Sequence, residues 1–163
     1  MCLSIRVRDM RQFPNSITSD ITIWVRYIDS LTNNNINVRC VLNKCFWNDD
    51  SISVFHKTGQ QITNSVTLYI PLRKEITGKQ FVTPEEWQAM PYDKLSDYWT
   101  FNIRQLPLMA KGDNSHEFTW GTAGAVTTQE NQFMTNNPSV RRATDFNLQN
   151  FGSVALQHIV IRA

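Results

Sequence analysis

Two thiols and an imidazole in the first half of the chain are the first side chains that could carry chemistry. Cys40 and Cys45 are separated by four residues, and His56 follows them. Zinc in proteins takes four ligands in a tetrahedral arrangement, and these three residues do not complete such a set. Within one strand, their odd spacing would also put the two thiols on opposite faces. The pattern therefore favours packed thiols without a metal.

The segment around His116 is a second candidate. Asp113, His116 and Glu117 could supply a general acid or base. The sequence lacks the motifs that place a nucleophile or a phosphate beside such a group, namely Gly-x-Ser-x-Gly, His-Glu-x-x-His and the Gly-rich phosphate loop. His158 lies in an apolar strand pattern, which is typical of a core or interface histidine. We therefore predict that the protein is not an enzyme and uses no metal or cofactor.

Other charged residues occur in short runs. The Asn-Asp-Asp run at 48–50 offers oxygen ligands but lacks the spacing of a calcium loop, and it is typical of a turn. A net charge of +2 is too small to indicate nucleic-acid binding by itself. Basic residues could still touch phosphates. Our candidates for contacts with DNA or with other subunits are Arg6, Arg8, Arg73, Lys74, Arg141 and Arg142.

Five tryptophans give the chain a large aromatic content. Trp87 and Trp99 lie within amphipathic elements, so we expect them in the core. Trp120 stands close to two glycines and is the candidate for a partner contact, because tryptophan is enriched at interface hot spots. An exposed set that included Trp47 and Trp120 could instead stack on sugars.

The elements that would position these side chains are mostly strands. Apolar residues alternate with a period of two in several segments, which predicts half-buried strands. Gly, Asn and Asp separate the segments and predict turns at 48–50 and 57–60. The fold class is therefore mainly β, an antiparallel β-barrel or sandwich. The predicted strands are residues 20–28, 36–47, 51–56, 65–70, 98–103, 106–109, 140–146 (expected to pair with the last strand) and 154–161.

One or two short helices accompany the strands. Thr83 is an N-cap with Pro84 at the first helical position, and Glu86 completes a capping box. Pro91 then limits that helix to about two turns. Residues 121–137 permit two interpretations, which are a long polar loop or a helix that faces inward through Val126, Phe133 and Met134.

The chain divides into an N-terminal arm, residues 1–19, and a single β-rich domain, residues 20–163. The candidate contact loops are the arm and residues 30–37, 57–64 and 121–137. Charged residues make up only 18% of the chain, so the surface is rich in amides and hydroxyls and suits contacts between subunits. The three cysteines, the absence of an apolar signal region in residues 1–10 and the lack of an apolar run of about 18 residues indicate synthesis in a reducing cytoplasm, without a membrane.

Three segments together resemble an uncharacterised family that is encoded in the structural gene blocks of tailed phages. That family has an apolar strand ending in Ile-Pro, as residues 65–71 do here. It has a short helix followed by a strand that opens with Trp-Thr, which residues 83–87 and 98–101 match. Its Asp-x-Gly-Ser turn and histidine strand correspond to residues 150–153 and 156–158, and its Lys-Gly element to residues 111–113. The resemblance covers roughly residues 37–163.

The resemblance implies a virion structural protein near the head–tail junction, because genes of this kind lie among minor capsid and connector genes. We expect a head-closure (stopper) or neck subunit, made in the bacterial host cytoplasm. It would form a ring of six or twelve copies between the portal or adaptor and the tail proteins, with contacts to packaged DNA. The alternatives are a tail terminator, a tail tube, a minor capsid or decoration protein, or a glycan-binding host-recognition module.

Overall fold

The structure is a computed structural model that describes residues 18–56, 58–102, 104–150, 152–153 and 157–163. Apart from Thr18 and Ser19, the expected N-terminal arm lies outside these residues, and so do Arg6 and Arg8. Seven strands form the main sheet: β1 Thr18–Ile28, β2 Asn35–His56, β3 Gly59–Pro71, β6 Leu108–Lys111, β7 Arg141–Arg142, β8 Asp145–Gln149 and β9 His158–Arg162. The smaller elements are α2 Lys74–Thr77, β4 Gln80–Phe81, α3 Pro84–Ala89, the 3-10 helix η2 Tyr92–Asp97, β5 Tyr98–Trp99 and α4 Ala123–Asn136.

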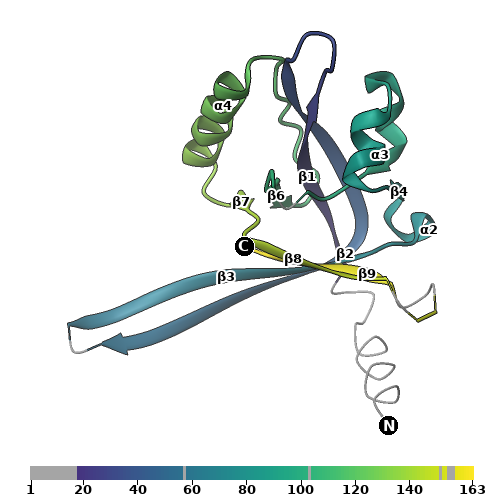
Figure 1. Ribbon diagram of the computed structural model, residues 1–163. Coiled ribbons are helices and arrows are strands. Elements are labelled where there is room, and N and C mark those ends of the chain that lie inside the picture. Colours follow the sequence, from purple (N-terminus) through teal and green to yellow (C-terminus); the bar gives the residue numbers. More distant parts are fainter. Residues whose placement is uncertain (1–17, 57, 103, 151, 154–156) are drawn as a thin grey trace.

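The main sheet has the strand order β7-β6-β1-β2-β3-β9-β8, and every neighbouring pair in it is antiparallel. The sheet curls into a half-barrel (Figure 1). β4 and β5 form a separate parallel pair. The predicted mainly β, antiparallel fold class is therefore confirmed.

β1 lies inside the sheet, between β6 and β2, and is buried on both faces. Ile21, Ile23 and Val25 face one side, and Thr22 and Trp24 face the other, all of them buried. α3 and α4 lie on opposite sides of this strand (Figure 1). An antiparallel strand that is apolar on both faces needs cover on both, and the two helices provide it.

A bulge in β2 changes which residues face the core. The register between β1 and β2 shifts between Ser19 and Ile21, opposite Lys44, whose φ of 53° is in the left-handed region. The extra residue restores Cys45 to the core face that Cys40 already occupies. The prediction that the two thiols lie on opposite faces is therefore wrong, and both are buried on the same face.

The predicted turn at residues 48–50 is also wrong. β2 continues through these residues as one strand of 22 residues, and it pairs with β3 as far as His56 and Gly59. The turn predicted at 57–60 overlaps the connection between the two strands, but Gly59 and Gln60 already belong to β3, and Lys57 lies outside the described residues. Among the described residues, β1 pairs with β2 only to Phe46, whereas β9 and the last residue, Ala163, pair with β3 only as far as Val66. The distal parts of β2 and β3 therefore form a two-stranded hairpin that projects from the body of the protein (Figure 1).

The C-terminal half differs from the prediction mainly in strand boundaries. The strand expected over 98–103 is only Tyr98–Trp99, and the one expected over 140–146 is divided between β7 and β8. β8 pairs with the last strand, β9, as predicted, whereas β7 pairs with β6. In β9 one face is fully buried through Ile159 and Ile161, and the other is only half-buried.

The helix beginning at Thr83 is confirmed with its capping box. The Thr83 hydroxyl accepts from the Glu86 amide (3.3 Å), and the Thr83 amide donates to the Glu86 carboxylate (2.8 Å). Residues 123–136 form a helix rather than a loop, and Thr122 is its N-cap. Its buried side chains are Val126, Glu130 and Phe133. None of the helices in the described part of the chain has the length and apolar character needed to cross a bilayer.

Candidate functional site

The projecting hairpin is the first candidate functional surface. We call residues 52–56 and 59–63 the hairpin arm; their pairing runs from Ile52–Thr63 to His56–Gly59. Within the described residues, no third strand pairs with either outer edge of this arm. From Asp50 to His56 the strand has seven residues, which corresponds to a length of about 23 Å. The two strands of the arm project from the body in the ribbon view (Figure 1).

Such an arm can form backbone hydrogen bonds with another chain. An outer strand edge presents N–H and C=O groups in the arrangement that a further strand would need. A two-stranded hairpin is marginally stable in water without additional strands or a packed face. The arm overlaps the predicted contact loop 57–64, which the structure shows to be mostly strand.

Trp120 belongs to an exposed aromatic cluster at the end of the body where β1 and β2 meet. Its side chain is 42% exposed, and its ring centroid lies 5.0 Å from that of Tyr92 and 6.2 Å from that of Tyr27. An isolated bridge between Asn35 and Gly121 holds the loop that carries Trp120. Trp47, by contrast, is only 7% exposed, so it cannot share a sugar-binding surface with Trp120.

The described members of the predicted basic set do not form one patch. Arg73 and Lys74 lie at the start of α2, whereas Arg141 and Arg142 form β7, on the other side of the body (Figure 1). The Arg73 Nε lies 3.7 Å from a carboxylate oxygen of Glu75. A role for these residues in DNA contacts stays a prediction.

Arg142 instead belongs to a buried ionic cluster under α4, which sequence reasoning missed. Glu130 Oε1 accepts from Arg26 Nη2 and from Asn37 Nδ2, both at 2.7 Å. Glu130 Oε2 accepts from Arg142 Nη2 at 2.9 Å. Only 7% of the Glu130 side chain is exposed. Side chains from β1, β2 and β7 thus all donate to one carboxylate on α4, which ties the helix to the sheet.

The arrangement stabilises the ionised form of Glu130. Burial works to raise the pKa of this carboxyl, but the hydrogen bond from Asn37, the charge of Arg26 and the hydrogen bond from Arg142 together outweigh it and hold the pKa below its ordinary value. The carboxylate is therefore charged at neutral pH.

The sequence does contain a signal for this cluster. Glu130 is the only charged residue within α4, and it falls four residues after Val126 and three before Phe133. Those spacings place it on the apolar face that packs on the sheet. A charged residue in such a position needs buried partners, but nothing in the sequence pattern identifies Arg26, Asn37 and Arg142 as those partners.

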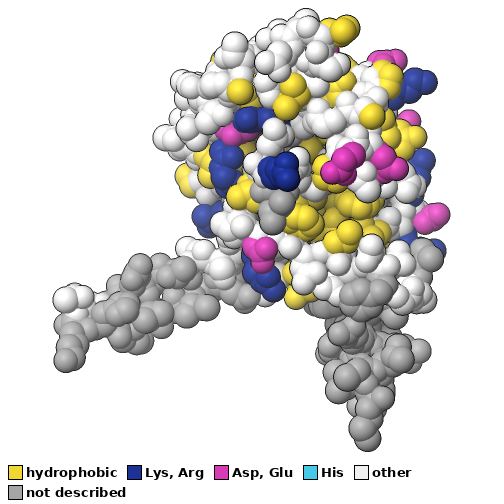
Figure 2. All heavy atoms as spheres, in the orientation of Figure 1, with side chains coloured by type: hydrophobic (Ala, Val, Ile, Leu, Met, Phe, Trp, Pro, Cys, Tyr) yellow, Lys and Arg dark blue, Asp and Glu magenta, His cyan; other side chains and the backbone are white. Residues whose placement is uncertain are grey.

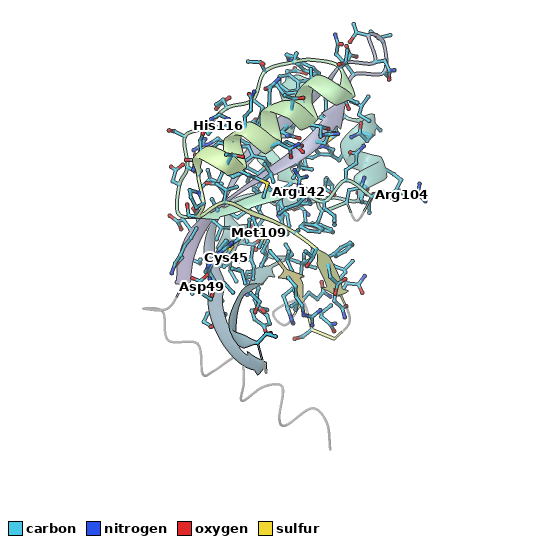
Figure 3. The ribbon with its side chains drawn as sticks, turned by 90° about the vertical axis from the view of Figure 1, so that its left-hand side faces the viewer. Cys45, Asp49, Arg104, Met109, His116 and Arg142 are labelled. Atoms are coloured by element: carbon cyan, nitrogen blue, oxygen red, sulfur yellow. The ribbon has the colours of Figure 1, made fainter. Side chains whose placement is uncertain are left out.

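A cavity of about 370 Å³ lies beside the Glu130 cluster. Its walls come from β1, β2, α4, β7 and the loop before β6. Two of the basic side chains are labelled in Figure 3, where Arg142 lies just below α4 and Arg104 at the margin of the molecule. The charged and amide residues that line the cavity are Arg26, Asn37, Arg104, Gln105, Glu130, Asn131 and Arg142.

Cys40, Cys45 and His116, which we considered for metal binding or catalysis, are engaged in packing, whereas the side chain of His56 lies outside the described residues. Burial raises the pKa of Cys40 to about 12 and also raises that of Cys45, so both thiols stay protonated at neutral pH. The His116 ring stacks on Phe133 with the centroids 3.9 Å apart, and burial lowers its pKa against the opposing charge of Glu117. Asp113 pairs with Arg39. Among the described residues, no three His, Cys, Asp or Glu side chains are grouped as a metal site requires.

Comparison with known proteins gives one family. No curated protein matches the chain, and no solved structure matches it. A family model described as a family of unknown function, DUF6751, matches residues 16–163. This match includes every residue that the structure describes, and the chain therefore belongs to the DUF6751 family.

Proposed function

We propose that the protein is a structural subunit of a homo-oligomeric assembly and that its hairpin arm joins it to a neighbouring copy. The observation that carries this proposal is the arm itself. From Asp50 to His56, the hairpin extends about 23 Å beyond the described strands that flank its base. A neighbouring subunit would pair a strand with the outer edge of the arm, which supplies the additional strand that the isolated hairpin lacks.

The assembly we propose is a phage head–tail connector, in which a ring of six or twelve copies lies between portal and tail. The support for this location is the resemblance to a family encoded among phage structural genes, which rests on residues 65–71, 83–87, 98–101, 150–153 and 156–158. An arm that reaches an adjacent subunit suits a ring, because each copy gives one arm and receives one. In a different location within a virion, the same geometry would serve a tail terminator, a tail tube or a decoration protein.

The test compares the wild-type chain with a variant that lacks the hairpin arm. Residues 52–63 are replaced by Asn-Gly, a two-residue turn that closes the Ser51–Asn64 pair. Analytical ultracentrifugation and negative-stain electron microscopy should show rings for the wild type and monomers for the variant. Leu31→Ser is the control, because Leu31 is 93% exposed in a different turn and its change should leave the rings intact.

Three outcomes would count against the proposal. A wild-type chain that stays monomeric at high concentration overturns the assembly role. Rings that persist without the arm overturn the arm's part in it. Cryo-electron microscopy of virions that carry the protein tests the location, since density away from the neck would reject the connector role but keep the assembly.

A second candidate function is glycan recognition through the exposed rings of Tyr92 and Trp120, which pack beside the buried ring of Tyr27. Aromatic rings exposed side by side can stack on sugar rings, and the Trp120 and Tyr92 side chains are 42% and 45% exposed. Binding on a glycan array that is lost in Trp120→Ala, without any change in oligomeric state, would favour this function over a connector.

A further inference from the structure

The side chains that line the cavity beside α4 carry a net positive charge. Three arginines line it, Arg26, Arg104 and Arg142, and one carboxylate, Glu130. The formal charge of its lining is therefore 3 − 1 = +2. Figure 2 shows Lys and Arg side chains gathered on this face of the body next to α4.

The arginines also retain hydrogen-bond donors. A guanidinium has five N–H groups. Both hydrogen bonds of the Arg26 side chain leave from Nη2, to Glu130 and to Thr127. The Arg104 guanidinium has no hydrogen bond or ion pair with any residue that the structure describes, and only its backbone amide is bonded, to Asn102. Arg142 donates from Nη1 to the Leu106 carbonyl oxygen at 3.4 Å and from Nη2 to Glu130, so the donors available to the cavity come chiefly from Arg26 and Arg104, with the charge of Arg142 beside them.

The charge and the size indicate the chemistry of a ligand. A phosphate monoester carries a charge of about −1.5 to −2 at neutral pH, which complements the lining better than the single charge of a carboxylate. Arginine binds phosphate oxygens through paired, charge-assisted hydrogen bonds. A volume of about 370 Å³ is that of a small-molecule pocket and exceeds what a bare phosphate ion needs.

We propose that this cavity binds a small phosphate monoester, with the phosphoryl group held between Arg26, Arg104 and Arg142. Glu130 fixes Arg26 and Arg142 in place and neutralises only one of them. The amides of Gln105 and Asn131 line the same cavity and give the organic part of the ligand hydrogen-bonding partners. This site is separate from the hairpin arm. Failure of the proposed assembly role would therefore not affect the proposal of ligand binding, and failure of ligand binding would not affect the assembly role.

The experiment is calorimetric titration of the full chain with glucose 6-phosphate, inorganic phosphate and glucose. We expect saturable binding of glucose 6-phosphate, weaker binding of inorganic phosphate and no binding of glucose. Arg104→Gln should weaken the binding of glucose 6-phosphate by about tenfold, because it removes charge-assisted hydrogen bonds to the phosphoryl group. Arg104 is exposed and has no structural ion pair, so this variant should fold, and circular dichroism checks that it does.

Arg73→Gln is the matched control, because it removes the same charge from α2, outside the cavity, and should leave the affinity unchanged. Several results would overturn the proposal. These are the absence of saturable binding up to about 10 mM glucose 6-phosphate, equal binding of glucose, or equal weakening in the Arg73→Gln control. Duplex DNA that binds more tightly than the monoester, with both variants equally affected, would assign the arginines to a general basic surface instead.

Discussion

The two halves of β2 lie in opposite environments although they form one continuous strand. From Asn35 to Phe46 the strand pairs with β1, its pairing with β3 begins at Phe46, and its side chains enter packed layers. Asn37 bonds the buried Glu130 on one face, and Cys40 lies in the core on the other. In the hairpin arm, the same strand pairs with β3, and among the described residues no further strand pairs with β2 or β3 there.

The difference shows where the protein's stability is located. The body has buried aromatic rings, an ionic cluster and cover on both faces of β1, whereas the arm has one ladder of hydrogen bonds. A part of the chain that contributes little to folding can be kept for contacts with another molecule. Substitutions in the body should therefore affect folding, and changes in the arm should affect assembly.

The largest expected effect on folding comes from Trp24 in β1. This side chain is 1% exposed, packs edge-on against Phe118 and Phe133, and donates from Nε1 to the His116 carbonyl oxygen at 2.9 Å. Trp24→Ala should lower the free energy of unfolding by about 3–5 kcal/mol, because it leaves a cavity between the sheet and α4. Urea denaturation, monitored by circular dichroism, measures this loss of unfolding free energy.

Trp120→Ala is the control for that substitution, since the Trp120 side chain is 42% exposed. It should cost much less, about 1 kcal/mol or below. Equal costs for the two substitutions would mean that the layer under α4 does not stabilise the body.

The second largest effect on the free energy of unfolding is expected for Glu130→Gln. The substitution keeps the shape of the side chain but leaves the Arg26 and Arg142 guanidinium groups facing each other without a carboxylate between them. Removing one member of a buried ionic cluster is strongly destabilising, and we expect a loss of about 3 kcal/mol in the free energy of unfolding. Glu117→Gln, at an exposed position outside the cluster, should change it by less than about 0.5 kcal/mol.

Wild type and Glu130→Gln should also differ in how the free energy of unfolding depends on pH, and this effect is smaller. The pKa of Glu130 is lower in the folded protein than its ordinary value of 4.5. A carboxyl with a lowered folded pKa stabilises the folded state above its unfolded pKa, and this stabilisation is lost as the pH falls through the folded value. The difference in unfolding free energy between wild type and Glu130→Gln should be constant between about pH 6 and 8 and should narrow below pH 4.5.

A difference that stays constant to the lowest pH at which the protein folds would contradict this assignment. It would mean that Glu130 stabilises the body through its shape and its hydrogen bonds rather than through its charge.

The sequence predicts the body better than it predicts the boundary between the body and the arm. The alternation in β1 and the capping box at Thr83 are local patterns, and both are confirmed. The Asn-Asp-Asp run at 48–50 has turn composition, but its pairing with residues 65–67 of β3 keeps it in a strand. Tertiary pairing overrides local preference here, as it often does in sheets.

The sequence does not predict the cluster around Glu130, because tertiary structure also decides which side chains meet there. Its four side chains come from β1, β2, α4 and β7, up to 116 positions apart in the chain, from Arg26 to Arg142. Periodicity places Glu130 on the packed face of its helix, but the partners depend on how the sheet curls. The bulge at Lys44 is similar, because a single residue in the left-handed region reverses the facing of every residue after it.

The smallest expected effect on folding comes from removing the hairpin arm. In the variant with Asn-Gly in place of residues 52–63, β2 and β3 keep their pairing from Phe46–Tyr69 to Ser51–Asn64, and the contacts of the body remain. The free energy of unfolding should therefore change by less than about 1 kcal/mol, because an isolated hairpin is itself only marginally stable. Urea denaturation of wild type and variant as monomers, at low protein concentration, measures this change without the contribution of assembly. A loss as large as that of Trp24→Ala would place the arm within the folding core, and it could then no longer be regarded as a segment kept for a neighbouring subunit.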